Sequence, residues 1–330
     1  MARAFVGISH TPLMGLNPIA EGAERILHQA LADLRAQVLA FDPDRIVLIA
    51  PDHYNGFFNA LMPPFCVGTQ AWSVGDYLSS AGQLRVDADC ALGMASHLLA
   101  ADFDVAISRA MEVDHGFAQP LELLWGSLDT PPVIPVFLNA VAPPGIPRLA
   151  RCRALGRAIG DYLDQDASRT LVIGSGGLSH EPPVPTLDHP DPAVRQRIIH
   201  RTEATPDERD AKTRRVMAAG VSLAAGEGTI KPLNPEWDRR WMEAMAGNDH
   251  GLDALCTLSE SSIDRDGGHS AHESKTWLVA RSAMPRSPSP RRASARCSSD
   301  ADGAVSLRLR HYQAIPEYIA GFGLMMMTDA

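Results

Sequence analysis

Short apolar runs and helical patterns of apolar residues alternate along the first half of the chain. Ala4–Ser9 and Ile46–Ile49 are apolar runs of the kind found in strands that a parallel sheet buries on both faces. Between them, from Ile19 to Phe41, apolar residues return at helical spacing. Strand, helix and strand in this order predict a right-handed βαβ unit.

The alternation continues to about residue 173. Helices are expected over Val86–Ala101, from near Pro120 to Leu128, and over Arg148–Leu163, and strands over Asp104–Ser108, Val133–Leu138 and Arg169–Ile173. Leu61–Asp76 is rich in Pro and Gly, so we expect an irregular excursion over the edge of the sheet. The pattern predicts an α/β fold with a central, largely parallel or mixed sheet flanked by helices.

The second half of the chain has a different character. Helices are expected within His189–Gly220, from Asn234 through Met245, and within His269–Ala283. Residues 281–311 are rich in Arg, Ser and Pro, with little to bury before Val305. The chain is expected to form one domain over 1–330, in which 281–311 is an exposed, flexible segment, either an insertion or a compensated reading-frame error.

Composition narrows the class of protein. The net charge of −9 argues against a nucleic-acid partner, and no apolar run approaches the ~20 residues that span a bilayer. The five cysteines are scattered without CxxC spacing, and the N-terminus is a poor signal peptide. These features predict a soluble, cytoplasmic enzyme with no membrane partner.

Four of the twelve histidines follow apolar or strand-like segments. His10 follows the first strand, and His53 follows the second within Asp52-His53-Tyr54-Asn55. His115 follows Met111–Asp114, and His180 ends the glycine-rich turn GSGGLSH, which lacks the spacing of nucleotide-binding loops. Open α/β sheets bind ligands past the carboxyl ends of their strands, so these histidines are expected to meet there.

A carboxylate completes the candidate site. His272 and Glu273 are adjacent on a predicted helix and face different ways, so one of them at most should reach the other histidines, and we choose Glu273. Two histidines and a carboxylate with open positions form the facial triad of non-haem Fe(II) oxygenases, and the same ligands also suit catalytic zinc. The residue types leave both metals open.

Several long stretches carry a resemblance to a known family. They are ISHTPLMG (8–15), APDHYNGFFNALMPPFCVG (50–68), VDHGFAQPLELL (113–124), GSGGLSHEPPVP (174–185) and HESKTW (272–277). The chain resembles the class III extradiol catechol dioxygenases over 1–280 and again over 312–323. It departs from them at 281–311, where the family continues with an apolar helical segment.

The resemblance implies a function and a role for each site residue. It implies Fe(II) bound by His10, His53 and Glu273, with His115 as proton donor and His180 as proton acceptor. Asp114, next to His115, is a further candidate, as a group that orients a ring nitrogen. The implied reaction is cleavage by O₂ of 3-(2,3-dihydroxyphenyl)propanoate and 2,3-dihydroxycinnamate in aromatic catabolism. A homo-oligomer, a tetramer or larger, is also implied. A zinc hydrolase and a non-catalytic binding protein of the same fold are the alternatives.

Overall fold

The structure is a computed structural model that describes residues 2–202, 204–285 and 305–329. In chain order its first elements are β1 (Arg3–Ile8), α1 (Glu21–Phe41), β2 (Arg45–Ala50), β3 (Phe65–Gly68), β4 (Ala71–Val74), β5 (Ala81–Gln83), α2 (Ala88–Ala100), β6 (Ala106–Ser108), β7 (Met111–Val113), α3 (His115–Trp125), β8 (Val133–Leu138), α4 (Leu149–Leu163) and β9 (Thr170–Ser175). They are followed by α5 (Pro192–Ile199), α6 (Pro206–Ala224), α7 (Pro235–Ala246), α8 (Asp249–Leu255), α9 (Glu260–Gly267), η1 (His269–Ser274), α10 (Lys275–Ser282), β10 (Ser306–Ile315), η3 (Pro316–Tyr318) and β11 (Ala320–Thr328).

Among the described residues, eight strands form the main sheet in the order β10-β11-β1-β9-β2-β8-β3-β6. The four central strands, β1, β9, β2 and β8, are parallel, and β11 joins β1 in the antiparallel sense. Ile8 pairs with Ser175, and Ile49 pairs with Gly174, so β1, β2 and β9 end at the same edge of the sheet. This mixed sheet confirms the expected fold class.

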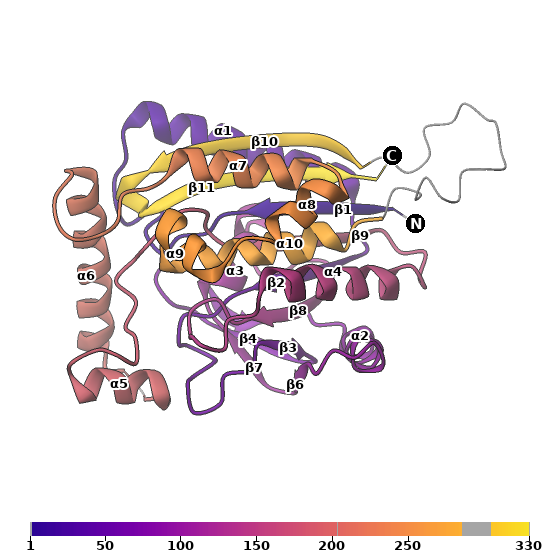
Figure 1. Ribbon diagram of the computed structural model, residues 1–330, viewed down its shortest axis with the longest axis horizontal. Coiled ribbons are helices and arrows are strands. Elements are labelled where there is room, and N and C mark those ends of the chain that lie inside the picture. Colours follow the sequence, from indigo (N-terminus) through magenta and orange to yellow (C-terminus); the bar gives the residue numbers. More distant parts are fainter. Residues whose placement is uncertain (1, 203, 286–304, 330) are drawn as a thin grey trace.

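Helices cover both faces of this sheet (Figure 1). One apolar cluster lies between the sheet and α2, α4, α7 and α10, and the other lies between the sheet and α1 and α3. Ile46, Val47, Leu48 and Ile49 of β2 are fully buried, as the continuous apolar run predicted. Burying one such side chain stabilises the fold by about 1.5–3 kcal/mol.

A second, smaller sheet places a loop beside the start of α3. Its strands have the order β5-β4-β7, and β4 runs parallel to β7 with Ser73 opposite Val113. Because parallel strands end at one edge, the turn after β4 lies next to the residues that follow β7. The irregular excursion expected over Leu61–Asp76 is therefore wrong in part, since β3 and β4 both lie within it.

Two further expectations need correction. Helix α3 begins at His115 rather than near Pro120, because the Asp114 side chain caps it by accepting from the backbone N–H of Gly116. The two ends of the stretch 281–311 are also regular: Arg281 is buried in α10, and β10 begins at Ser306. The expectation of a flexible segment between these ends falls on 286–304, which lie outside the described residues.

Candidate active site

His10 lies just past β1 and is held by the end of β9. Its Nδ1 is 2.9 Å from the hydroxyl of Ser175, and that hydroxyl donates its proton to the carbonyl of Gly116 at 2.7 Å. Ser175 therefore accepts from the His10 ring, which places the ring proton on Nδ1 and leaves a lone pair on Nε2. This Nε2 is buried without a hydrogen-bond partner among the described atoms.

His53 lies past the end of β2 and has a carboxylate partner. The Oδ2 of Asp114 is 3.0 Å from the ring Nδ1 and accepts from the His53 backbone N–H at 2.7 Å. The adjacent Asp52 is fully buried and accepts from three backbone N–H groups, those of Asn55, Gly56 and Phe57. These bonds fix the turn, so Nε2 of His53 points inward.

The glycine-rich turn after β9 brings His180 to the same place. Nδ1 of His180 is 2.9 Å from the carbonyl oxygen of Leu178, so Nδ1 carries the ring proton. Its Nε2 is 3.1 Å from Oε1 of Glu273, which projects from η1. A Cβ at Gly176 would lie 2.5 Å from the carbonyl oxygen of Glu273, so only glycine permits this approach.

Glu273 lies at the centre of the cluster and is almost completely buried. Oε1 is also 3.1 Å from Nε2 of His53, whereas Oε2 is 3.4 Å from Nε2 of His10. Oε2 also accepts from the backbone N–H of Gly177 at 3.0 Å. The chosen member of the pair His272-Glu273 thus lies with the histidines, while His272 contacts Asp264 and Glu260 on α9.

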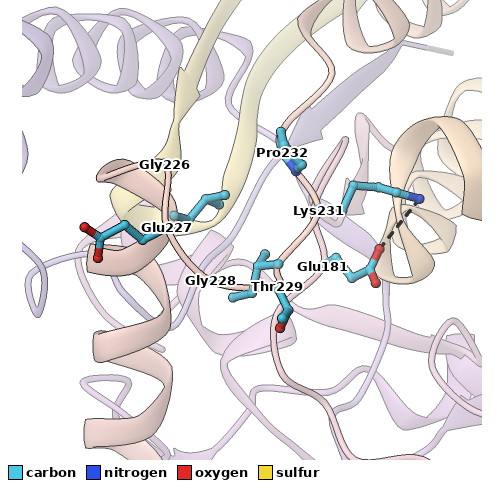
Figure 2. A pocket seen from close by; sticks show the side chains of 9 residues that line it. Glu181, Gly226, Glu227, Gly228, Thr229, Lys231 and Pro232 are labelled. Carbon is cyan, nitrogen blue, oxygen red and sulfur yellow. Dashed lines mark ion pairs between the residues drawn. The ribbon is translucent and has the colours of Figure 1, made fainter.

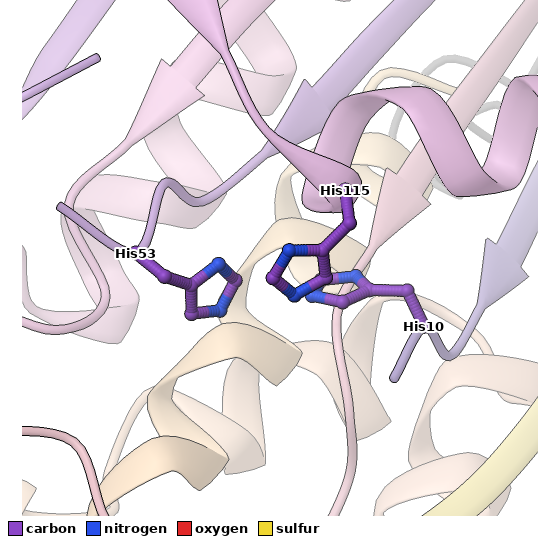
Figure 3. A group of neighbouring side chains, drawn as sticks. All are labelled: His10, His53 and His115. Carbon is purple, nitrogen blue, oxygen red and sulfur yellow. The ribbon is translucent and has the colours of Figure 1, made fainter. Parts of the chain in front are cut away.

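His115, the first residue of α3, completes the group. Its ring stacks on that of His53 with centroids 4.6 Å apart, and its Nδ1 lies 2.6 Å from Oδ2 of Asp76. The rings of His10, His53 and His115 converge in Figure 3, and one ligand nitrogen from each lies within 4.8 Å of the others. The structure therefore gathers all five residues that the sequence singled out.

These residues fit a divalent transition metal. Each of the four histidines has its Nδ1 committed to a hydroxyl, carboxylate or carbonyl oxygen, which leaves Nε2 as the inward-facing atom. Metal-binding histidines usually donate their second N–H in this way. The orphaned Nε2 of His10 and the buried carboxylate of Glu273 supply donors of the kind that such an ion needs.

Burial and the charges of neighbouring groups shift the pKa values of the site residues in opposite directions. Burial lowers the pKa of His10 to about 3, which keeps its imidazole neutral. Burial also lowers the pKa of His53, but Asp114 and Glu273 outweigh it and raise that pKa well above its usual value. Burial would raise the pKa of Glu273, yet the neighbouring His180 ring outweighs it and holds that pKa well below its ordinary value.

A separate hollow of about 550 Å³ lies where the chain leaves the site. Glu181, which follows His180, lines it together with Leu223 and the loop 226–232 (Figure 2). Lys231 also lines this hollow, and its Nζ lies 3.9 Å from Oε2 of Glu181 and donates to the carbonyl of Asp264. None of the five gathered residues lines it, so the chemistry of the site lies elsewhere.

Sequence reasoning missed two residues of the site. Asp76 lies in a stretch expected to be irregular, and Ser175 is the last residue of a buried strand. Neither position carries a sequence signal, because each contacts a histidine that is remote in the chain. The sequence left open whether Asp114 orients a ring nitrogen, and in the structure its Oδ2 lies 3.0 Å from Nδ1 of His53.

The fold agrees with the comparison of the chain with protein families. Residues 4–309 match the family described as the catalytic LigB subunit of aromatic ring-opening dioxygenase, and the chain belongs to that family. The expected resemblance and the expected enzyme class, a ring-cleaving dioxygenase, are confirmed.

Individual relatives are similar over nearly the whole chain. A protein of Comamonas testosteroni named 2,3-dihydroxyphenylpropionate/2,3-dihydroxicinnamic acid 1,2-dioxygenase is 57% identical, over 98% of this chain and 96% of its own length. Proteins of the same name from Cupriavidus pinatubonensis and Mycobacterium ulcerans are 46% and 45% identical, each over 98% of this chain and 97% and 98% of their own lengths.

A more distant likeness concerns the fold alone. The crystal structure of an uncharacterized protein, JW3007, from Escherichia coli K12 has a TM-score of 0.51 at 12% identity, and the match covers 100% of both chains. In the part of the chain that the structure describes, no helix is long and apolar enough to cross a membrane.

Proposed function

We propose that this chain is an Fe(II)-dependent extradiol dioxygenase that cleaves 3-(2,3-dihydroxyphenyl)propanoate and 2,3-dihydroxycinnamate with O₂. The products are 2-hydroxy-6-oxonona-2,4-dienedioate and the corresponding trienedioate. The names of the relatives support the substrates. The observation that carries the proposal is the convergence of Nε2 of His10 and Nε2 of His53 on the carboxylate of Glu273. Two histidines and one carboxylate are the ligand set of non-haem Fe(II) oxygenases.

The iron would be held by His10, His53 and Glu273. When bound, Fe(II) supplies the electron transfer that joins O₂ to a chelated catechol. The three residues offer two imidazole Nε2 atoms and one carboxylate; His10 and Glu273 are almost completely buried, and the His53 side chain is 14% exposed. The carboxylate balances part of the metal charge.

His180 is the proposed proton acceptor. Its Nδ1–H is committed to the Leu178 carbonyl, so Nε2 is the atom free to take a proton from a catechol hydroxyl. In the structure this Nε2 already faces the acceptor Glu273 at 3.1 Å, an arrangement that stabilises the protonated ring. His115 is the proposed proton donor, and its Nε2 would give a proton to the ring-derived carbon as the substrate opens.

The test combines metal analysis with oxygen consumption. Protein purified without oxygen is expected to hold about one ferrous ion per chain, and catechol turnover should consume one O₂ with both atoms entering the product. Stoichiometric zinc, no need for iron and no oxygen consumption with a catechol would indicate the hydrolase instead. Tight catechol binding without turnover in the iron-loaded protein would indicate a binding protein.

The location of the protein, its oligomeric state and its domain organisation stay predictions. We propose that the enzyme is cytoplasmic, that it is a homo-oligomer of four or more subunits, and that its chain 1–330 folds as one catalytic domain. The last two are checked by light scattering after size-exclusion chromatography and by calorimetry. A monomer, or two separate unfolding transitions, would contradict them.

A further inference from the structure

Asp76 lies in the turn that follows β4, beside the first residue of α3. Because β4 and β7 are parallel, their carboxyl ends bring this turn next to Asp114 and His115. The Asp76 side chain is 13% exposed and that of His115 is 4% exposed, so the two groups meet largely out of water. The chain thus brings a carboxylate to the histidine from 39 residues away.

The carboxylate contacts His115 twice. Oδ2 lies 2.6 Å from the ring Nδ1, and Oδ1 accepts from the backbone N–H of His115 at 2.8 Å. The backbone bond uses one of the free N–H groups at the start of a helix, where negative charge is favoured. Two contacts from one planar group fix both the position of the residue and the rotation of its ring.

The contact also determines which ring nitrogen carries the proton. An ionised carboxylate only accepts hydrogen bonds, so Nδ1 of His115 must donate. Nε2 is then the ring nitrogen that can exchange a proton with the substrate. The His115 ring packs between two other rings: it stacks on His53 with centroids 4.6 Å apart, and it meets Tyr77 in a T-shaped contact with centroids 5.3 Å apart. A ring flipped about its axis would lose the bond to Asp76.

We propose that Asp76 is the positioning residue of His115, holding the Nδ1–H tautomer so that Nε2 exchanges the proton with the substrate. This inference rests on the proposed function, in which His115 is the donor. The protonated ring gives the proton on Nε2 to the substrate carbon and becomes neutral with its proton on Nδ1. Asp76 exchanges no proton in this step, so the step needs no other proton.

The first experiment removes the charge and keeps the shape. In Asp76→Asn, the amide NH₂ can donate to Nδ1 and so favours the opposite tautomer. The kcat should fall roughly 10- to 100-fold, the range for carboxylates that orient a functional histidine, while KM and iron content stay within about twofold. An unchanged kcat would overturn the proposal.

A double variant separates positioning from general damage. If Asp76 acts through His115, the Asp76→Asn change should cost less than about twofold in kcat once His115→Gln is present. Equal losses in both backgrounds would show that Asp76 acts independently of this histidine. That outcome would also overturn the proposal.

The chain offers a matched control on the same loop and the same helix. Glu122 of α3 accepts from the backbone N–H of Ser80 at 2.8 Å, which ties the other end of the turn to α3. Glu122→Ala removes this acceptor and should leave kcat within about twofold of the wild type. A loss equal to that of Asp76→Asn would mean that attachment of the loop, rather than orientation of His115, matters.

A measurement on the metal-free protein needs no turnover. Solid-state ¹⁵N NMR with labelled histidine should show His115, assigned by its disappearance in His115→Gln, with a proton on Nδ1 in the wild type and with Nδ1 unprotonated in Asp76→Asn. The same tautomer in both proteins would contradict the proposal. If no catechol is cleaved, the proposed function fails, and this spectrum still tests the Asp76–His115 pair.

Discussion

The two halves of the site are held in different ways. In the N-terminal half, His10, His53 and His115 each bond through Nδ1 to a side chain, namely Ser175, Asp114 and Asp76. In the C-terminal half, His180 bonds to a backbone carbonyl, and the Glu273 carboxylate accepts from a backbone N–H. The first half should therefore respond to single polar substitutions, and the second to changes in backbone packing.

The packing of the C-terminal half is tight. A Cβ at Gly174 would lie 2.6 Å from the carbonyl oxygen of Thr276, and the indole N–H of the fully buried Trp277 donates to the carbonyl of Gly176 at 3.0 Å. The Thr276 hydroxyl is also 2.9 Å from the carbonyl of Ser175. The turn after β9 and the start of α10 thus form one unit that positions Glu273.

Removing a proposed ligand should have the largest effect in either half. His53→Ala and Glu273→Ala are each expected to reduce bound iron to less than about a tenth of the wild type, and turnover should be lost with it. Metal analysis after anaerobic purification, with circular dichroism to confirm folding, measures this. Retention of stoichiometric iron by either folded variant would contradict its assignment as a ligand.

Substitution of the two proton-transfer residues should have the next largest effect. It compares the two halves directly, because His115 lies in the N-terminal half of the site and His180 in the C-terminal half. His115→Gln and His180→Gln should each keep iron yet lose roughly 10²- to 10⁴-fold in kcat, the range for a positioned acid or base. Metal content is decisive for His115, because its ring lies within reach of His10 and His53. Loss of iron in His115→Gln would make it a ligand instead of the donor.

A methyl group at Gly176 should test the backbone packing of the C-terminal half. Gly176→Ala places a Cβ against the Glu273 carbonyl, so the free energy of unfolding should fall by about 1–3 kcal/mol and iron should bind more weakly. Urea denaturation and iron titration measure both effects. Gly22→Ala in α1, where a Cβ meets nothing within 4 Å, is the control and should be neutral or stabilising. Equal destabilisation of both variants would refute the packing argument.

The smallest effect is expected for the hydrogen bonds of Asp238, which holds Ser179, the residue before His180. Asp238 is fully buried and accepts from the N–H and hydroxyl of Ser179, each at 2.7 Å, and from the hydroxyl of Tyr312 at 2.6 Å. Tyr312→Phe removes one of three donors and should lower the free energy of unfolding by about 1 kcal/mol, with little change in kcat. Chemical denaturation checks the first value. A large fall in kcat with unchanged stability would show that β10 acts on the site directly.

The sequence determined the central parallel strands of the sheet and four of the loops that carry the site. Continuous apolar runs such as Ile46–Ile49 are buried on both faces, and the polar residues after β1, β2 and β9 lie at one edge because those strands are parallel. The local pattern is enough to predict these features, because periodicity indicates which residues are buried and the helical connections indicate that the strands are parallel. The same reasoning predicted α1 and α4 to within a few residues.

Only the tertiary structure decided how each histidine is oriented. Asp76 reaches His115 through a small sheet that the Pro- and Gly-rich stretch did not reveal, and Ser175 reaches His10 from a strand whose residues read as core. The place of Glu273 depends on close contact with Gly176, 97 residues earlier in the chain. Hydrogen bonds and close packing of this kind join residues that are remote in sequence, so the proton on each ring is set by a neighbour that periodicity does not identify.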